Sequence, residues 1–544
     1  MAHETRLSEE LHPMLNSSGD IQRVAYTSDT ENNNNNNNNN NVKNGKSPLH
    51  KEEAAVQYSS NAKGVLAQCL VTGAVLLLVT GGGMPIGYSA VLLPQLSESN
   101  STIYMDSEVG SWIASIHSLA TPVGSLLSGP LLEMIGRRSS LQWATIPLCI
   151  GWLIIGFSKS VVAILIGRIV CGISVGLMPV PSQILVGEMA DPGLRGFLLV
   201  FSFASYCLGI LMVYALGASF NWDIVAFSGL VLPILAFIAL CLVPESPTWL
   251  VRRKKNEEAK KALLWLRGGD VDQVNAEIAL LNAGMRTDVT EKPTNVSLRK
   301  RIFSAMSVIR DPGVLKPLII IGIFNILQLS SGTYIIVFYA VDIIKEIGGG
   351  DVDNYLVAVV TAVIRFIFSI VSCVVLLKMG RRSLGIVSAL GTSLASLILA
   401  GYIIYIARKE ESSADGYVLV CLLFYVGANT MGLLTLPGLM AGELFPLKAR
   451  GIGGGCTFFV YNLLLFFVTK CFPWVNASVG ITGVFVIFGI SALLEAIFIY
   501  LALPETKDCT LQEIEDYFQQ SNLLWITRTR SRRDTFVPTN DASA

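Results

Sequence analysis

The stretch Pro244-Glu245-Ser246-Pro247-Thr248-Trp249-Leu250 opens a long charged interval that lies between two large blocks of apolar segments and runs to about Pro312. Four consecutive basic residues, 252–255, follow it directly. Lys and Arg gathered beside membrane segments are typical of cytoplasmic loops. The interval therefore divides the chain into two halves and predicts which side of a membrane its middle occupies.

The interval contains two helical patterns, 259–267 and 271–281. The first is preceded by Asn256-Glu257-Glu258, which is typical of a capped helix start, and Glu257 stands four residues before Lys261. We expect surface helices here. The alternative is a solvated linker without fixed structure, which charge runs often are.

The two flanking blocks are apolar, since 52% of the 544 residues are hydrophobic and only 15% are charged. Runs of about 18 or more nearly uncharged residues recur, each long enough for a hydrocarbon core about 30 Å thick. We therefore expect a multi-pass membrane protein with six spans in each half: 65–91, 109–133, 141–158, 161–186, 197–218 and 225–243, then 315–341, 354–378, 384–405, 417–440, 452–473 and 480–503.

The predicted fold is an all-α membrane protein with twelve transmembrane helices in two pseudo-symmetric six-helix bundles. Its expected parts are a disordered cytosolic tail with an asparagine tract (1–64), the first bundle (65–243), a cytosolic helical linker (244–312), the second bundle (313–503) and a cytosolic C-terminal tail (504–544). The tract at 32–41 supports the disordered tail, because asparagine alone cannot bury apolar surface.

The distribution of basic residues predicts the orientation. An even number of spans puts both termini on one side, and the short loops of that side carry Arg137, Arg138, Arg195, Lys378, Arg381, Arg382, Lys448 and Arg450. The opposite loops carry fewer: Lys159, Lys345, Arg408, Lys409 and Lys470. With the basic interval added, the positive-inside rule places both termini in the cytoplasm, and we expect the plasma membrane. Asn100-Ser101-Thr102 then lies outside as an acceptor for N-glycosylation.

Three charged signatures occur in the same order in both halves. They are Gly136-Arg137-Arg138 with Gly380-Arg381-Arg382, Gly187-Glu188 and Arg195-Gly196 with Gly442-Glu443 and Arg450-Gly451, and Pro244-Glu245-Ser246 with Pro504-Glu505-Thr506. Ordered repetition of this kind indicates two related bundles. In such proteins the substrate site lies between the repeats near mid-membrane, and the halves rock around it.

The signatures place carboxylates and guanidinium groups at facing helix ends, where they can form charge-assisted pairs while the cytosolic side is closed. The members of this predicted conformational latch are Arg137, Arg138, Glu188, Arg195, Glu245, Arg381, Arg382, Glu443, Arg450 and Glu505. The alternative is that the arginines only set the topology.

These signatures, with Gly167-Arg168, Pro192, Pro247 and Lys507, make the chain resemble the sugar porter family of the major facilitator superfamily over roughly 65–515. Within it, the chain is most similar to insect facilitated trehalose transporter-like proteins, through Thr469-Lys470-Cys471-Phe472 and the short outer loops. The resemblance implies facilitated or proton-coupled movement of a monosaccharide or disaccharide.

By the resemblance, the sugar site is only partly kept. Gln328 matches the first of two glutamines in the seventh span, but Leu329 stands at the second. The candidate substrate-binding residues are Gln328, Tyr334, Tyr339, Thr435, Phe203 and Arg365, of which the kept ones are Gln328 and Tyr339. Lost amides remove hydrogen-bond discrimination, so the pocket can hold a sugar but a glucose-like specificity does not follow.

Charges inside the spans need partners or a role. Arg365 would cost about 2.5–3.5 kcal/mol if unpaired, so it either binds substrate hydroxyls or an anionic substrate, or pairs structurally across helices. Glu495 is comparably deep. His117 either senses pH or bonds a neighbouring Ser or Thr. The first span, between Val65 and Gln95, has no Asp or Glu, whereas proton-linked family members carry an aspartate there, which favours a uniporter.

No constellation of residues supports hydrolysis, metal binding or phosphate binding, and the cysteines form no close pairs. We expect no enzyme activity, cofactor, metal, nucleic acid or obligate protein partner. The expected function is facilitative transport of a sugar of the trehalose or hexose class by alternating access, with the sugar and the lipid bilayer as partners. The alternatives are a non-transporting nutrient receptor with the transporter fold, a carrier of another small metabolite such as an organic anion, or a proton-coupled sugar symporter.

Overall fold

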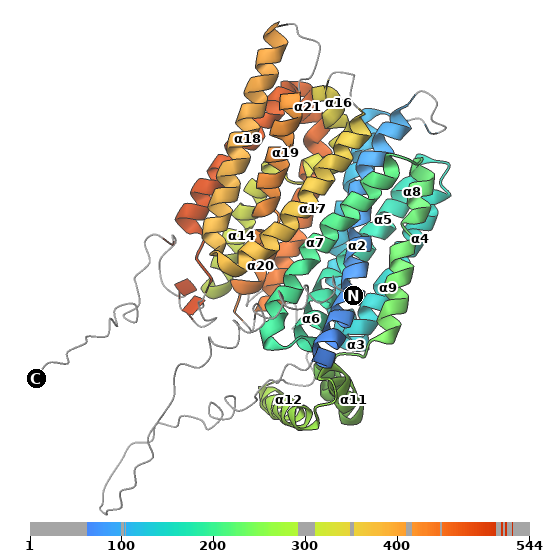
Figure 1. Cartoon of the computed structure of the whole chain (residues 1–544), viewed down its shortest axis with the longest axis vertical. Helices are drawn as coiled ribbons and strands as arrows, with labels where there is room; N and C mark the ends of the chain where they lie inside the picture. The colour runs from blue at the N-terminus through green and yellow to red at the C-terminus, as the bar shows by residue number, and fades with distance from the viewer. Residues whose placement is uncertain are drawn as a thin grey trace, which may run out of the picture. The chain divides into compact units, whose positions relative to one another are not determined.

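The structure is a computed structural model that describes residues 62–98, 103, 105–291, 310–348, 353–409, 416–446, 449–507, 513–514, 517–518 and 525. Among these residues the regular structure is helical and no strand occurs. The asparagine tract and the glycosylation candidate Asn100 lie outside the described residues. Figure 1 labels most of the helices by the names used below.

The first half is built of α2 (Ala62–Ser97), α3 (Ser107–Ile135), α4 (Arg137–Gly156), α5 (Val161–Leu177), α6 (Pro179–Met189), α7 (Pro192–Gly217), α8 (Trp222–Ser228) and α9 (Val231–Leu242). Two expected spans are each split into two helices. The fourth breaks between α5 and α6, where Pro179 takes the first helical position and cannot donate a hydrogen bond to the preceding turn. The sixth breaks between α8 and α9 at Gly229.

The second half is built of α14 (Pro312–Ser330), α15 (Ile335–Phe338), α16 (Ala340–Gly348), α17 (Asn354–Lys378), α18 (Arg381–Lys409), α19 (Gly416–Met431), α20 (Leu436–Glu443) and α21 (Arg450–Ala502). Here the seventh expected span is divided among α14, α15 and α16, and the tenth between α19 and α20. The sequence did not predict these breaks, which position the candidate site.

Ten helices of the described chain are long and apolar enough to cross a membrane. One of them, α21, contains two crossings, because Gly480 interrupts it with a non-helical φ of 69°. Helix α3 adds a crossing by length, with its 29 residues. Its mean hydropathy is lowered by buried polar side chains: Ser111, Ser115, His117, Ser118, Thr121 and Ser128. The result is the predicted all-α fold of twelve transmembrane helices.

The described part of the charged interval forms three helices, α10 (Pro247–Arg252), α11 (Asn256–Leu266) and α12 (Val271–Glu291). Helix α11 buries Ala259, Ala262, Leu263 and Leu266, so it is packed against the protein along one face. Asn256 is its first residue, and the preceding Lys255 makes no side-chain cap, so the expected cap is not formed.

Arg267 fixes α11 to the first half. Its guanidinium is 3.1 Å from Asp191 in the connection between α6 and α7, and it also pairs with Glu277 of α12 at 2.8 Å. The Asp191 carboxylate in turn accepts a hydrogen bond from Gln68 of α2 at 2.7 Å. We call the end of the bundles that carries α10–α12 the linker end, and the opposite end the far end.

The two halves contact each other along α3 with α21 and along α7 with α17, and α15 and α16 contact α2 near the far end. Tyr214 of α7 donates a hydrogen bond to the Val337 carbonyl of α15 at 2.6 Å. Cys373 of α17 donates to the Val200 carbonyl of α7 at 3.4 Å, closer to the linker end. Elements from both halves therefore enclose the region where the helices of the second half are broken.

Candidate functional site

Two helix breaks lie next to each other in the second half. Between α14 and α15 the chain turns at Gly332, whose φ of 84° is left-handed. A Cβ there would also come within 2.5 Å of Phe488. The second break, between α19 and α20, is tied to the first because Gln328 Nε2 donates to the Leu433 carbonyl at 3.0 Å. Broken helices near mid-membrane are where transporters of this architecture form substrate sites.

Three tyrosines meet beside these breaks: Tyr334 from the first break, Tyr461 from α21 and Tyr206 from α7 of the first half. The rings of Tyr334 and Tyr461 meet edge to face at 6.1 Å between centroids. The Tyr334 side chain lies near the hydroxyls of both other tyrosines, and Gln328 lies near that of Tyr461. We call these four residues the tyrosine cluster. It offers hydroxyls, an amide and aromatic faces at a point reached by both halves.

Arg365 of α17 lies close to this cluster. It is 4% exposed, its Nη1 has no hydrogen-bond partner among the described residues, and it lies near the side chains of Tyr206, Tyr334 and Tyr425. Among the described residues it forms no ion pair. The structural alternative, a charge paired across helices, is therefore not realised in this state, and a guanidinium donor remains free beside the tyrosines.

Glu495 of α21 is fully buried, and neither carboxylate oxygen has a described partner. Its charge and that of Arg365 both act on Tyr425 of α19, whose hydroxyl donates to the Ser331 carbonyl in the first break. Glu495 is therefore, with Arg365, a second buried ionisable side chain beside the first break.

The other sequence-predicted residues do not join the tyrosine cluster. Thr435, just before α20, bonds to Ser372 of α17 at 3.0 Å. Phe203 of α7 lies against Gly438, where an added Cβ would be 3.0 Å from the phenyl ring. Tyr339 donates to the Thr469 carbonyl at 3.1 Å. The structure thus brings Gln328, Tyr334 and Arg365 together and places Thr435, Phe203 and Tyr339 elsewhere.

Sequence reasoning missed several polar residues of this region. Tyr206 and Tyr425 were not selected, nor were Asn325 and Asn429, which are each 1% exposed and carry amide atoms without a partner in the described chain. All four stand in apolar runs, where an uncharged polar residue is a weak signal. The helix breaks decide which polar residues lie near the site, and the hydrophobic periodicity of the sequence does not reveal these breaks.

The repeated signatures meet at the linker end of the first half. Arg137 and Glu188 form a bidentate pair, with Nε–Oε2 at 3.0 Å and Nη2–Oε1 at 3.2 Å. Ser246 donates its hydroxyl to the same carboxylate. Glu245 accepts hydrogen bonds from the backbone N–H groups of Arg137 and Arg138, both at 2.9 Å, and thereby caps the start of α4. We call these residues the first-half cluster.

The second half repeats this arrangement. Arg381 pairs with Glu443 at 3.1 Å, and Thr506 donates to the same carboxylate, as Ser246 does in the first half. Glu505 accepts hydrogen bonds from the backbone N–H groups of Arg381 at 2.9 Å and Arg382 at 3.2 Å, at the start of α18. We call these the second-half cluster. The sequence repeat is therefore also a repeat of hydrogen-bonding geometry.

The remaining predicted latch members behave differently. Arg195 is exposed and makes no ion pair with a described residue, and the side chain of Arg450 lies outside the description. Each ion pair of the two clusters lies within one half, and in the described chain none of them joins the halves. The contacts stabilise each bundle at its linker end; whether they act as a latch stays a prediction.

Two buried groups bear on proton coupling. Arg168 of α5 is fully buried and donates to the Pro85, Ile113 and Ala114 carbonyls and to the Ser89 hydroxyl. Its N–H groups therefore bind neutral acceptors, and among the described residues none of them pairs with a carboxylate. Of the two alternatives for His117, the hydrogen bond to a neighbouring Ser or Thr is not formed, because both ring nitrogens lack a partner in the described chain.

Comparison with known proteins gives consistent matches along the chain. The sugar (and other) transporter family matches residues 60–518. The chain is 30% identical over 474 residues to the facilitated trehalose transporter Tret1-2 homolog of Drosophila sechellia, covering 86% of this chain and 95% of that protein. It is 29% identical to facilitated trehalose transporter Tret1 of Bombyx mori, covering 80% and 85%.

Among solved structures, the fold resembles the proton:xylose symporter XylE bound to 6-bromo-6-deoxy-D-glucose, with a TM-score of 0.64 and 24% identity over 82% of this chain and 99% of that one. An inward-open structure of XylE from E. coli also gives a TM-score of 0.64, with 21% identity over 82% and 98%. At these identities the structures support the fold alone. These matches are to transporters, not enzymes, and the chain belongs to the sugar (and other) transporter family.

Proposed function

We propose that the protein is a facilitative transporter of a neutral sugar, of the trehalose or hexose class, that works by alternating access. The observation that carries the proposal is the tyrosine cluster, which combines hydroxyls, an amide and aromatic faces beside two helix breaks. Sugars are bound by short hydrogen bonds to their hydroxyls and by aromatic contact with their C–H faces. The named trehalose transporters among the relatives support this substrate class.

Within this site, Gln328 and the hydroxyls of Tyr206, Tyr334 and Tyr461 are proposed to hydrogen-bond the sugar. Arg365 is proposed to donate to a sugar oxygen through Nη1, which has no hydrogen-bond partner in the described part of the chain. Thr435 and Phe203 lie where α7, α17 and α20 meet, and are proposed to line the route from the site toward the linker end. Tyr339, held on Thr469, is proposed to act at the far end.

The proposed transport cycle follows from where the halves contact each other. Near the far end, Lys470 of α21 donates to Ser111 of α3 at 2.7 Å, and Tyr214 of α7 donates to Val337 of α15 at 2.6 Å. These contacts must break when the far end opens. The first-half and second-half clusters would keep each bundle rigid at its linker end, so that the halves move as bodies around the site.

Transport is proposed to be uncoupled from protons. Arg168 uses its donors on backbone carbonyls and Ser89, and the first span has no carboxylate that could accept a proton. The linker end is proposed to face the cytoplasm together with both termini, in the plasma membrane, because the basic residues gather there. Asn100 would then be available for glycosylation on the outer side.

The unpartnered guanidinium of Arg365 favours one further candidate, a carrier of a small organic anion with hydroxyl groups. A buried cation without a carboxylate partner can be neutralised by a bound anion. The two candidates differ in their dependence on the Arg365 charge. Replacement by Gln keeps a donor for a sugar hydroxyl but abolishes attraction for an anion.

The proposal is tested by uptake of radiolabelled trehalose, glucose and a hydroxylated organic anion into oocytes that express the protein. Surface expression is measured in the same cells. The expected result is saturable uptake of a sugar that persists after a protonophore is added. Uptake of the anion alone would replace the sugar proposal by the organic-anion candidate. Sugar uptake that collapses with the protonophore would contradict uniport while leaving the substrate class intact.

A further inference from the structure

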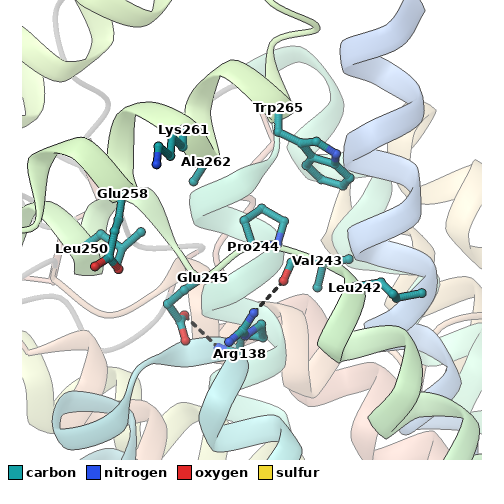
Figure 2. A pocket seen from close by; sticks show the side chains of 10 residues that line it. All are labelled: Arg138, Leu242, Val243, Pro244, Glu245, Leu250, Glu258, Lys261, Ala262 and Trp265. Atoms are coloured by element: carbon teal, nitrogen blue, oxygen red, sulfur yellow. Dashed lines mark hydrogen bonds between the residues drawn. The ribbon is translucent and has the colours of Figure 1, made fainter.

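A pocket of about 470 Å³ lies where the linker meets the first half. One wall is formed by the end of α9 and the residues after it, the other by α10 and α11, as Figure 2 shows. Its lining includes Arg138, Leu242, Glu245, Glu258, Lys261 and Trp265. The volume is in the range of small-ligand sites. The transport site described above uses none of these residues.

The two carboxylates of the pocket already have partners. Glu245 accepts hydrogen bonds from the backbone N–H groups of Arg137, Arg138 and Ser246, each at 2.9 Å. Glu258 pairs with Lys255, outside the pocket, at 3.1 Å. Their negative charge is therefore largely compensated before any ligand enters.

The two cationic side chains of the pocket, Arg138 and Lys261, have no carboxylate partner among the described residues. Arg138 donates through Nη1 to the Val243 carbonyl at 2.9 Å, a neutral group, and its guanidinium pairs with no described carboxylate. Lys261 on α11 is exposed and forms no ion pair with a described residue. In Figure 2 the two side chains lie on opposite walls, Lys261 on α11 and Arg138 at the start of α4. The pocket thus holds two cations whose side chains form no ion pair with a described residue.

The apolar part of the pocket continues into the membrane surface. Leu242 is the last residue of a membrane-crossing helix and is 79% exposed. Trp265 of α11 is 38% exposed in the same pocket, and tryptophan is enriched at the boundary between membrane and water. A ligand that fits must have an anionic group at the cations and an apolar part that extends along Leu242.

We propose that this pocket binds an anionic phospholipid of the membrane leaflet next to the linker. Its phosphate would lie between Lys261 and Arg138, and an acyl chain would follow Leu242 into the bilayer. Anionic lipids are concentrated in the cytoplasmic leaflet, which matches the proposed orientation of the linker end. Since α11 and the end of α9 form opposite walls, the bound lipid stabilises the docking of the linker on the first half.

The second half shows why the site is specific to the first. There Arg382, the counterpart of Arg138, is covered by Tyr500, with its guanidinium carbon 5.1 Å from the ring centroid, and it donates to the Tyr500 carbonyl. No described helix covers it as α11 covers Arg138. The repeat supplies the arginine in both halves, but the linker supplies Lys261 and Trp265 only once.

The test uses the full-length protein in nanodiscs of phosphatidylcholine, with and without phosphatidylserine, and counts the phosphatidylserine molecules retained by native mass spectrometry. Lys261→Gln removes the free cation from the pocket, and Lys260→Gln removes an equal charge from the neighbouring position of α11. We expect Lys261→Gln to weaken phosphatidylserine retention about fivefold and Lys260→Gln to leave it nearly unchanged. A further variant, Trp265→Ala, is expected to weaken it without any change of charge.

Equal losses in the two lysine variants would overturn the proposal, because they would indicate non-specific attraction to a basic surface. The same holds if the unmodified protein retains phosphatidylcholine and phosphatidylserine equally. Thermal unfolding of the detergent-solubilised protein with inorganic phosphate separates the two sources of phosphate. Stabilisation by free phosphate that is lost in Lys261→Gln would assign the site to a soluble anion and also overturn the lipid assignment. None of these outcomes depends on which sugar is transported.

Discussion

The Lys470 ammonium lies 4.3 Å from the centroid of the Trp112 ring, so a cation of the second half rests on an aromatic face of the first. The same ammonium donates to Ser111 at 2.7 Å, and the Trp112 ring also contacts Phe466 at 5.9 Å between centroids. All three contacts join α3 and α21 near the far end. They can exist only while that end is closed. Opening the far end must therefore break them, and the free energy of opening includes their loss.

Replacement of Lys470 by Gln should favour the state that is open at the far end. A cation–π contact at a partly exposed site contributes about 1 kcal/mol, equivalent to about fivefold in the closed-to-open ratio. The half-saturation concentration for sugar offered from the far side should fall by two- to fivefold. Lys345→Gln is the matched control, since Lys345 is exposed on α16 at the same end. Equal effects of both variants would count against the proposed contact.

Gly136→Ala should destabilise the protein strongly. Gly136 has a φ of 102°, and a Cβ there would lie 2.5 Å from the Glu245 carboxylate that caps α4. Backbone strain of this kind costs about 1–3 kcal/mol, before any displacement of the carboxylate is added. The thermal unfolding midpoint in detergent should therefore drop by several degrees. Gly187→Ala is the control, because its added Cβ would meet no atom within 4 Å. It should be neutral or slightly stabilising; a similar drop would contradict the geometric explanation.

Glu245→Gln tests the first-half cluster through charge alone. The amide retains an oxygen acceptor for the N–H groups of Arg137 and Arg138 but loses the charge that favours a carboxylate at a helix N-terminus. We expect a loss of about 1–2 kcal/mol in stability. Glu257→Gln, at an exposed position of α11, should have no measurable effect. A Glu245→Gln protein as stable as the unmodified one would show that the charge of the Glu245 carboxylate does not stabilise the bundle.

Arg365→Gln should raise the half-saturation concentration for sugar about tenfold, while the protein still reaches the cell surface. One hydrogen bond from a charged donor is worth about 1.5–3 kcal/mol, and Gln restores part of it. Arg365→Lys keeps the charge and should retain more affinity. Unchanged affinity for sugar in the Gln variant would show that Arg365 does not contact the substrate.

The broad fold can be predicted from the sequence because the lengths of the apolar runs and the repeated charged signatures are visible there. Long apolar runs predict the crossings because the bilayer fixes their length, and the repeated Gly-Arg-Arg and Pro-Glu signatures predict two related bundles. The structure then shows Glu245 and Glu505 in the same capping role, at the starts of α4 and α18. That role was not predicted, because it depends on residues more than a hundred positions apart.

The candidate site was less predictable. The structure brings the candidates Gln328, Tyr334 and Arg365 near one another, and their role in substrate binding stays a prediction. Tyr206 was not selected, since an isolated tyrosine in an apolar span has no distinctive pattern. The breaks at Gly332 and after Met431 decide which side chains meet, and apolar composition continues unchanged across both. Likewise, the pocket beneath α11 arises from the docking of Arg267 on Asp191, a tertiary contact without a local signal.

The most direct test of the account is trehalose and glucose uptake into proteoliposomes that contain the purified protein and no imposed ion gradient. The account predicts saturable, bidirectional uptake of at least one of the two sugars that stops at equal concentrations inside and outside. It also predicts that Tyr334→Ala, at unchanged protein content, lowers this uptake at least tenfold, because the variant removes the residue that joins Tyr206 to Tyr461. Absence of uptake of both sugars by folded protein, or uptake that requires a proton gradient, would contradict a facilitative sugar transporter.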